Sequence, residues 1–120
     1  MAVESRYQLD IMSLSEGHLE MYLGDYETQV EQLPEWAEEW ASLDEEERMH
    51  YEAEFDLALG RRLVLEEVLG AGRLTREQEA ALERVDRLAE MRRDLIRALF
   101  GTEVEELLGR VAFASRERSA

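Results

Sequence analysis

The fold class of this chain is decided by residues 45–69, which read EEERMHYEAEFDLALGRRLVLEEVL. Asp44 precedes them as a candidate N-cap, and Glu47 stands three residues later in capping-box position. The three glutamates that open the stretch suit the first turn of a helix, because the helix macrodipole favours negative charge there. The glycines that follow it break the pattern. The stretch therefore predicts one long helix.

This helix carries apolar residues on two faces. One face holds Met49, Ala53, Leu57, Gly60, Val64 and Val68. The other holds Leu59, Leu63, Leu65 and Leu69. A helix that is apolar nearly all round is usually surrounded by other elements, so we expect this one at the centre of the fold.

A second long helix is predicted before this one, over residues 14–32. Ser13 and Glu16 have capping-box spacing at its start. The apolar residues behind them recur at the i, i+3, i+4, i+7 spacing of one helix face. Pro34 is expected to end this helix, because proline in a helix interior removes a hydrogen bond. A short amphipathic helix over residues 35–42 follows.

A third long helix is predicted over residues 76–100. Thr75 is its N-cap with Gln78 in capping-box position, and Gly101 follows its last turn. A wide apolar stripe on this helix offers a surface for a homodimer. Its other face alternates the two signs of charge and is expected to be exposed; it holds Glu83, Arg84, Asp86, Arg87, Glu90, Arg92, Arg93, Asp94 and Arg97.

A last short helix is predicted over residues 103–113, with Thr102 and Glu105 as its capping pair. Sustained alternation of β-branched residues, the signal of a strand, is missing. We therefore expect an all-α fold, a small helical bundle of three long helices plus two short ones. Residues 1–114 are expected to form a single α-helical domain, and residues 115–120 a flexible C-terminal tail.

The composition excludes several classes of function. The 120-residue chain has no cysteine, which excludes disulfides, thiolate chemistry and cysteine-bound zinc. Its net charge of −15 opposes direct contact with nucleic-acid phosphates and with anionic membrane surfaces. No apolar run is long enough to span a membrane and no signal peptide is visible, so the expected location is the cytoplasm. The two histidines show no pairing with a nucleophile, so we expect a protein that is not an enzyme.

The acidic residues are concentrated in the first half of the chain. Residues 1–60 hold 17 acids and two arginines, whereas residues 61–120 hold 12 acids and 12 arginines. The first half also holds seven of the nine aromatic residues. An acidic half that is rich in aromatic side chains indicates a surface for a protein partner of basic character.

Four glutamates of the first helix form an acidic stripe beside its apolar stripe: Glu16, Glu20, Glu27 and Glu31. They fall within about 60° of one another at the helical rotation per residue. One interpretation is a docking surface for a basic protein partner. A sharper hypothesis is a nucleic-acid mimic, which would inhibit a DNA- or RNA-binding protein. The alternative without a function is a solvated face.

Trp36 and Trp40 lie one helical turn apart. Two indoles on one face can anchor a partner, since tryptophan is enriched at binding hot spots. They can equally hold a short helix onto the bundle. Both roles remain open from the sequence.

Glu47 and His50 form a Glu-x-x-His element, which on a helix places a carboxylate and an imidazole on one face. Ferritin-like bundles bind iron or manganese with two such elements and two further glutamates. This chain has only one such element, so the site would need a dimer. The structural alternative is a partly exposed histidine next to carboxylates, with no cofactor.

The favoured function is that of an accessory, adaptor or inhibitor protein that acts by protein–protein interaction. It is expected to be a homodimer and to dock a basic partner through its acidic N-terminal half. The metal protein and the nucleic-acid mimic are the alternatives.

Overall fold

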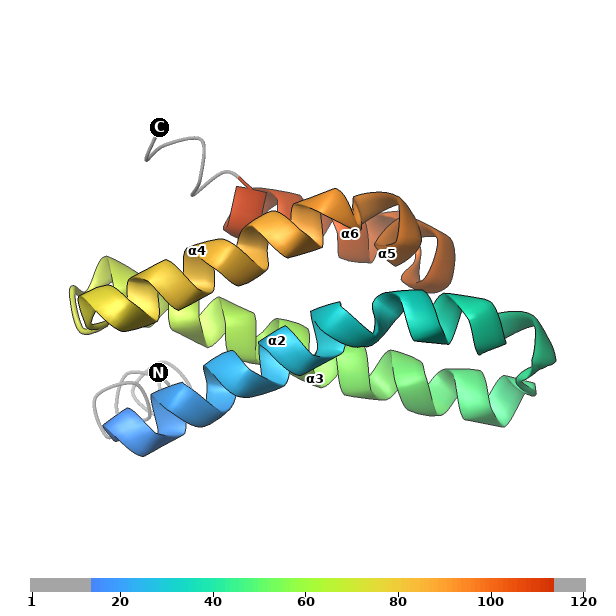
Figure 1. Ribbon diagram of the computed structural model, residues 1–120, viewed down its shortest axis with the longest axis horizontal. Helices are drawn as coiled ribbons and strands as arrows, with labels where there is room; N and C mark the ends of the chain where they lie inside the picture. Colours follow the sequence, from blue (N-terminus) through green and yellow to red (C-terminus); the bar gives the residue numbers. More distant parts are fainter. Residues whose placement is uncertain (1–13, 114–120) are drawn as a thin grey trace, which may run out of the picture.

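The computed structural model describes residues 14–113, which fold as a bundle of helices (Figure 1). The helices are α2 (Glu16–Glu39), α3 (Glu45–Gly70), α4 (Arg76–Met91), α5 (Arg93–Phe100) and α6 (Thr102–Leu108). A short 3-10 turn at Trp40–Ser42 follows α2, and a π-helical turn at Gly109–Phe113 follows α6. No strand occurs among these residues. The predicted all-α bundle is confirmed, and the predicted tail at 115–120 lies outside the described residues.

Helix α2, not α3, is the central helix of the bundle. Figure 1 shows α2 and α3 side by side as a hairpin, with α4 returning along them. Helix α2 packs against α3, α4 and α5. One face of α2 is therefore fully buried, and it comprises Leu19, Leu23, Tyr26, Val30, Leu33 and Trp36.

The first apolar face predicted for α3 is wrong as a core face from Met49 to Gly60, whereas Val64 is half-buried and Val68 is buried as predicted. Met49 is 61% exposed and Leu57 is 57% exposed, and Ala53 and Gly60 are also exposed. The buried face of the helix includes Leu59 and Leu65 of the second predicted face, and in full it comprises Phe55, Ala58, Leu59, Arg62, Leu65 and Val68. The reason is the inward position of Arg62, whose charge is neutralised by a carboxylate of α4. This position turns the stripe that begins at Met49 out to solvent.

The helix starts are set by local side-chain hydrogen bonds. The N-cap of α2 is Ser15, whose hydroxyl accepts from the backbone N–H of His18 at 3.2 Å, with the imidazole of His18 completing a capping box. The predicted pair of Ser13 and Glu16 is therefore wrong as the cap, and Ser13 itself lies outside the described residues. The predicted boxes at Asp44–Glu47 and Thr75–Gln78 are confirmed.

The prediction that Pro34 ends the first helix is wrong, because α2 continues through Pro34 to Glu39. Proline has no N–H, so the Val30 carbonyl one turn earlier has no helical donor. The guanidinium of Arg92 donates to this carbonyl at 2.8 Å and to the carbonyl of Glu31 at 2.9 Å. A donor from a distant part of the chain thus replaces the missing helical hydrogen bond.

The helix predicted over 76–100 is divided at Arg92, which leaves the helical conformation with φ −102° and ψ 17°. The break turns α5 away from the axis of α4 (Figure 1). Ile96 and Leu99 then remain buried in the core. Gly101 ends α5 with a φ of 104°, a left-handed value that favours glycine, as its predicted position implied.

The bond from Arg92 to α2 can be tested in a thermodynamic cycle. We expect Arg92→Leu to lower the free energy of unfolding by about 1–3 kcal/mol, because it leaves the Val30 carbonyl without a donor. In a Pro34→Ala background the restored helical N–H should reduce that loss. Urea unfolding of the wild type, the two single variants and the double variant measures the cost of Arg92→Leu in each background.

Arg84→Leu is the matched control, since Arg84 pairs with Glu27 at the surface. Its small cost should be the same in both backgrounds. An equal cost of Arg92→Leu with and without Pro34 would contradict the claim that Arg92 replaces the helical hydrogen bond missing at Pro34.

Candidate protein-docking groove

An aromatic cluster joins α2, α3 and α5 near the end of the hairpin. The rings of Phe55 and Phe100 are stacked with centroids 4.4 Å apart, and those of Trp36 and Tyr51 are 4.8 Å apart. Trp40 meets Phe100 edge to face at 5.9 Å. Such contacts stabilise beyond their buried area and fix the positions of the rings.

The sequence left two roles open for Trp36, as an anchor for a partner or as a packing residue of the bundle. The cluster supports the packing role. Its side chain is 5% exposed, so little of it is available to a partner. Trp40 is half-buried, and the guanidinium of Arg48 lies 5.8 Å from the centre of its ring. Arg48 also donates from Nε to the Trp40 carbonyl at 2.9 Å. Arg48 therefore closes the turn between α2 and α3.

A groove opens beside this cluster, between α3 and the α5–α6 corner. Its volume is about 360 Å³, and it is lined by Met49, Glu52, Ala53, Phe55, Asp56, Phe100 and Val104. Phe55 is only 2% exposed and supports Phe100 from below, so the half-buried Phe100 supplies the accessible aromatic surface of an apolar floor. Met49, Ala53 and Val104 extend this apolar surface. The groove is thus a preformed apolar depression at the protein surface.

Glu105 holds the α6 side of the groove in place. Its carboxylate accepts from Nε of Arg93 in α5, and Nη1 of Arg97 lies 3.5 Å away. The hydrogen bond from Arg93 lowers the pKa of Glu105 from its usual value, and the charges of both arginines add to this effect. The predicted capping role with Thr102 is therefore wrong: Glu105 instead ties α6 to α5 across Gly101, next to Val104.

The groove has an acidic rim. Glu52 and Asp56 line it and are exposed, and no arginine is among the lining residues. Glu45 and Glu46 are exposed at the start of the same helix. The electrostatic potential at the groove is therefore negative and favours a ligand with positive charge.

The acidic stripe on α2 has partners within the chain. Glu20 accepts from the amide of Gln78 at 3.1 Å, and Glu27 pairs with Arg84 at 2.7 Å. Glu16 and Glu31 are exposed. The stripe therefore borders α4, and part of its charge is neutralised there.

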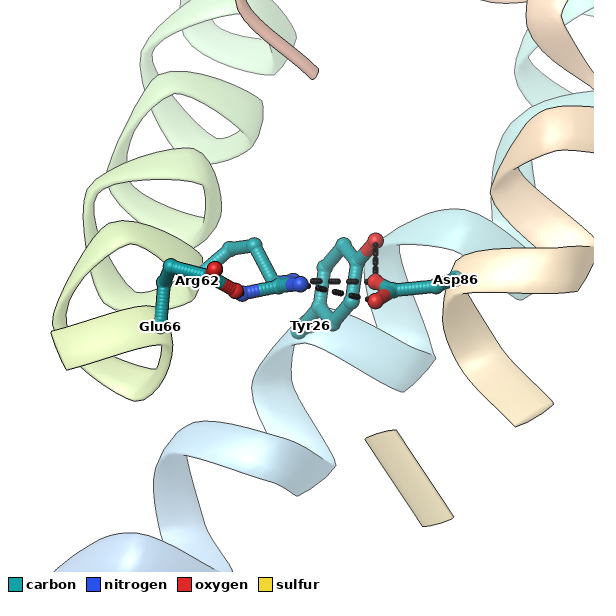
Figure 2. Close-up of polar contacts among 4 residues, drawn as sticks. All are labelled: Tyr26, Arg62, Glu66 and Asp86. Carbon is teal, nitrogen blue, oxygen red and sulfur yellow. Dashed lines mark hydrogen bonds and ion pairs between the residues drawn. The ribbon is translucent and has the colours of Figure 1, made fainter. Parts of the chain in front are cut away.

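A buried polar cluster links α2, α3 and α4 at the centre of the bundle (Figure 2). Arg62 donates two hydrogen bonds to Asp86, from Nε at 2.9 Å and from Nη2 at 2.7 Å. The hydroxyl of Tyr26 donates to Asp86 at 2.7 Å, and Arg62 also meets Glu66 at 3.1 Å. The sequence placed Asp86 on an exposed mixed-charge face. That prediction is wrong, because Asp86 is the counterion of a buried arginine.

This cluster is closed to substrates. The side chain of Arg62 is 0% exposed, so solvent does not reach its charge. Burial raises the pKa of Tyr26 well above its usual value, and Asp86 raises it further. Burial acts to lower the pKa of Arg62, but the hydrogen bonds and charge of Asp86 give a net increase. Tyr26 therefore stays neutral and Arg62 stays charged, which suits a structural role.

The predicted metal ligands Glu47 and His50 lie near the start of α3. The carboxylate of Glu47 accepts from the backbone N–H of Asp44 at 3.1 Å, and Nε2 of His50 lies 3.1 Å from Glu54. Within residues 14–113, no group of three or more histidine, aspartate or glutamate side chains is placed to hold a metal ion. An iron or manganese site would need ligands beyond those that these residues bring together, and the ferritin-like hypothesis takes them from a second copy.

Comparison with known proteins gives no match: no protein-family model fits the chain, and no curated protein or solved structure is similar to it. In the part of the chain that the structure describes, no helix has the length and apolar character needed to cross a membrane.

Sequence reasoning did not identify the groove. It singled out Met49 and Ala53 as part of an apolar face of α3, which was a usable signal. It assigned that face to the core, and it had no means of placing Phe100 and Val104 opposite it.

The importance of the buried ion pair can be measured by removing one partner or the whole cluster. We expect Asp86→Ala to lower the free energy of unfolding by about 3–5 kcal/mol, because it leaves the charge of Arg62 buried without a counterion. The triple variant Tyr26→Phe, Arg62→Met, Asp86→Leu should be more stable than that single variant. Urea unfolding gives both values.

Glu27→Ala is the surface control, and it should cost about 0–1 kcal/mol. A cost of Asp86→Ala no larger than this control would show that the pair does not hold the bundle together.

Proposed function

We propose that the protein is a non-enzymatic accessory, adaptor or inhibitor protein that docks a basic protein partner through its acidic N-terminal half. The observation that carries the proposal is the groove beside α3. It combines an apolar floor of Phe55 and Phe100 with an acidic rim of Glu52 and Asp56. A surface pocket of this kind suits the apolar anchor of a partner that also carries positive charge.

The two parts of the groove support different aspects of binding. The apolar floor supplies most of the affinity, because buried anchors in well-packed pockets dominate binding energies. The carboxylates speed the encounter with a basic partner and disfavour acidic ones. The exposed acids of the stripe, Glu16, Glu20 and Glu31, add to the long-range attraction, whereas Glu27 is paired with Arg84 of α4.

Self-association is the second candidate. The predicted dimer surface on residues 76–100 is largely used within the chain, since Leu82, Val85, Ala89, Ile96 and Leu99 are buried. A homodimer would use the exposed side of α3 instead, where Met49 and Leu57 are more than half exposed.

The proposal predicts that partner association depends on the rim of the groove. A tagged protein should retain a basic protein from its native lysate and release it in moderate salt. With that partner purified, we expect Glu52→Gln, Asp56→Gln to slow association by about two- to tenfold, because rim charges act mainly on the association rate. Surface-immobilised kinetics at several salt concentrations measures the effect.

Glu67→Gln, Glu106→Gln is the matched control, since it removes the same charge from exposed positions that do not line the groove. Equal association rates for the two double variants would remove the groove from the proposal. Retention that does not respond to salt would contradict docking by charge.

A further inference from the structure

We propose that the groove receives an amphipathic helix of the partner. A bulky apolar side chain of that helix packs on Phe100, which Phe55 supports from below, and its arginines or lysines meet Glu52 and Asp56. This inference rests on the proposed function and specifies the part of the partner that the groove recognises.

The exposed side of α3 carries a row of apolar and small residues. Met49, Ala53, Leu57 and Gly60 follow one another at four-, four- and three-residue intervals, so they lie along one side of the helix. All four are exposed. The groove lies alongside this row, with Met49 and Ala53 belonging to both. The apolar surface is therefore long and follows a helix axis, and a second helix packs well on such a surface.

Two residues in this row are small. Ala53 and Gly60 have little or no side chain, and nothing lies within 4 Å of where a Cβ of Gly60 would be. Glycine inside a helix is destabilising relative to alanine, and no contact within the chain requires it here. Small residues allow the axis of a second helix to approach closely.

The helical fold also limits the class of ligand. Extended peptides commonly bind proteins by adding a strand to a sheet edge, and residues 14–113 form no strand. The remaining common mode for an apolar groove between helices is a helix with anchors at i, i+3, i+4 and i+7. The groove volume of about 360 Å³ leaves room for a large apolar side chain of such a helix.

The charge of the groove favours a basic ligand. Both ionisable residues that line the groove are acids, and the nearby Arg48 is directed to the Trp40 carbonyl instead. A second copy of this chain would bring the same acidic rim to a two-fold interface, which is unfavourable. A helix with basic flanks complements the groove.

The test uses a fluorescein-labelled peptide of leucine and lysine, about five helical turns long, with leucine at the helical spacing. Its control has the same composition with leucine and lysine in strict alternation, so that no helical face is apolar. Fluorescence anisotropy should show that the helical peptide binds at least about tenfold more tightly than the alternating one.

Two variants locate the binding site. Ala53→Gln places a larger neutral side chain in the groove and should weaken binding of the helical peptide about tenfold, whereas Ala98→Gln on the exposed face of α5 should not. Glu52→Gln, Asp56→Gln should weaken it about three- to tenfold and reduce its dependence on salt. Circular dichroism melting verifies that each variant is folded.

Equal binding of the two peptides would overturn the helix as ligand. If peptide binding weakens in Glu52→Gln, Asp56→Gln but not in Ala53→Gln, the groove is overturned as the helix site, although the proposed basic partner still stands. Insensitivity to both variants would overturn both proposals. A dimer that Ala53→Gln dissociates would identify a second copy as the occupant and likewise overturn the inference.

Discussion

The buried ion pair between Arg62 and Asp86 is the interaction on which the arrangement of the helices depends. A charged guanidinium without contact with water needs a counterion and further hydrogen-bond acceptors, because the desolvation of an ion is costly. Asp86 of α4 supplies the counterion, and Tyr26 of α2 completes the hydrogen bonding of that carboxylate. The pair therefore determines which side of α3 faces the core. The opposite side, beginning at Met49, is left at the surface, and the groove forms along it.

Arginines of the second half of the chain make most of the polar connections between the helices. Arg61 pairs with Asp25, Arg84 pairs with Glu27, and Arg92 donates to the carbonyls beside Pro34. These contacts bind the nearly neutral half to the acidic half and neutralise part of α2. Exposed carboxylates remain on both helices, with Glu35, Glu38 and Glu39 near the end of α2 and Glu52 and Asp56 beside the groove on α3. The charge asymmetry of the sequence therefore leaves an acidic surface over α2 and α3, and part of that surface borders the groove.

The sequence predicts those features that arise from contacts between near neighbours. The all-α class and the capping boxes at Asp44 and Thr75 depend on residues within one or two helical turns, and these predictions are confirmed. The continuation of α2 through Pro34 depends on Arg92, which lies far away in the sequence, so local rules gave the wrong end of that helix.

The same limit applies to the site. Hydrophobic spacing identified the row from Met49 to Gly60 as one side of a helix but could not determine that it is exposed. That outcome depends on Arg62, which a hydrophobic pattern treats as a surface residue. The tryptophans and the acidic stripe stood out by composition, yet Trp36 is buried and Glu27 has an arginine partner in the chain. The residues opposite α3 in the groove, Phe100 and Val104, come from a corner that only the tertiary structure places there.

The most direct test is to locate the bound peptide by methyl NMR while the protein is titrated with the helical leucine–lysine peptide. The account predicts that the largest shift changes fall on the methyl groups of Met49, Ala53 and Val104. Changes concentrated instead on Ala80, Leu88 and Met91, which line the surface between the α2 stripe and α4, would contradict it.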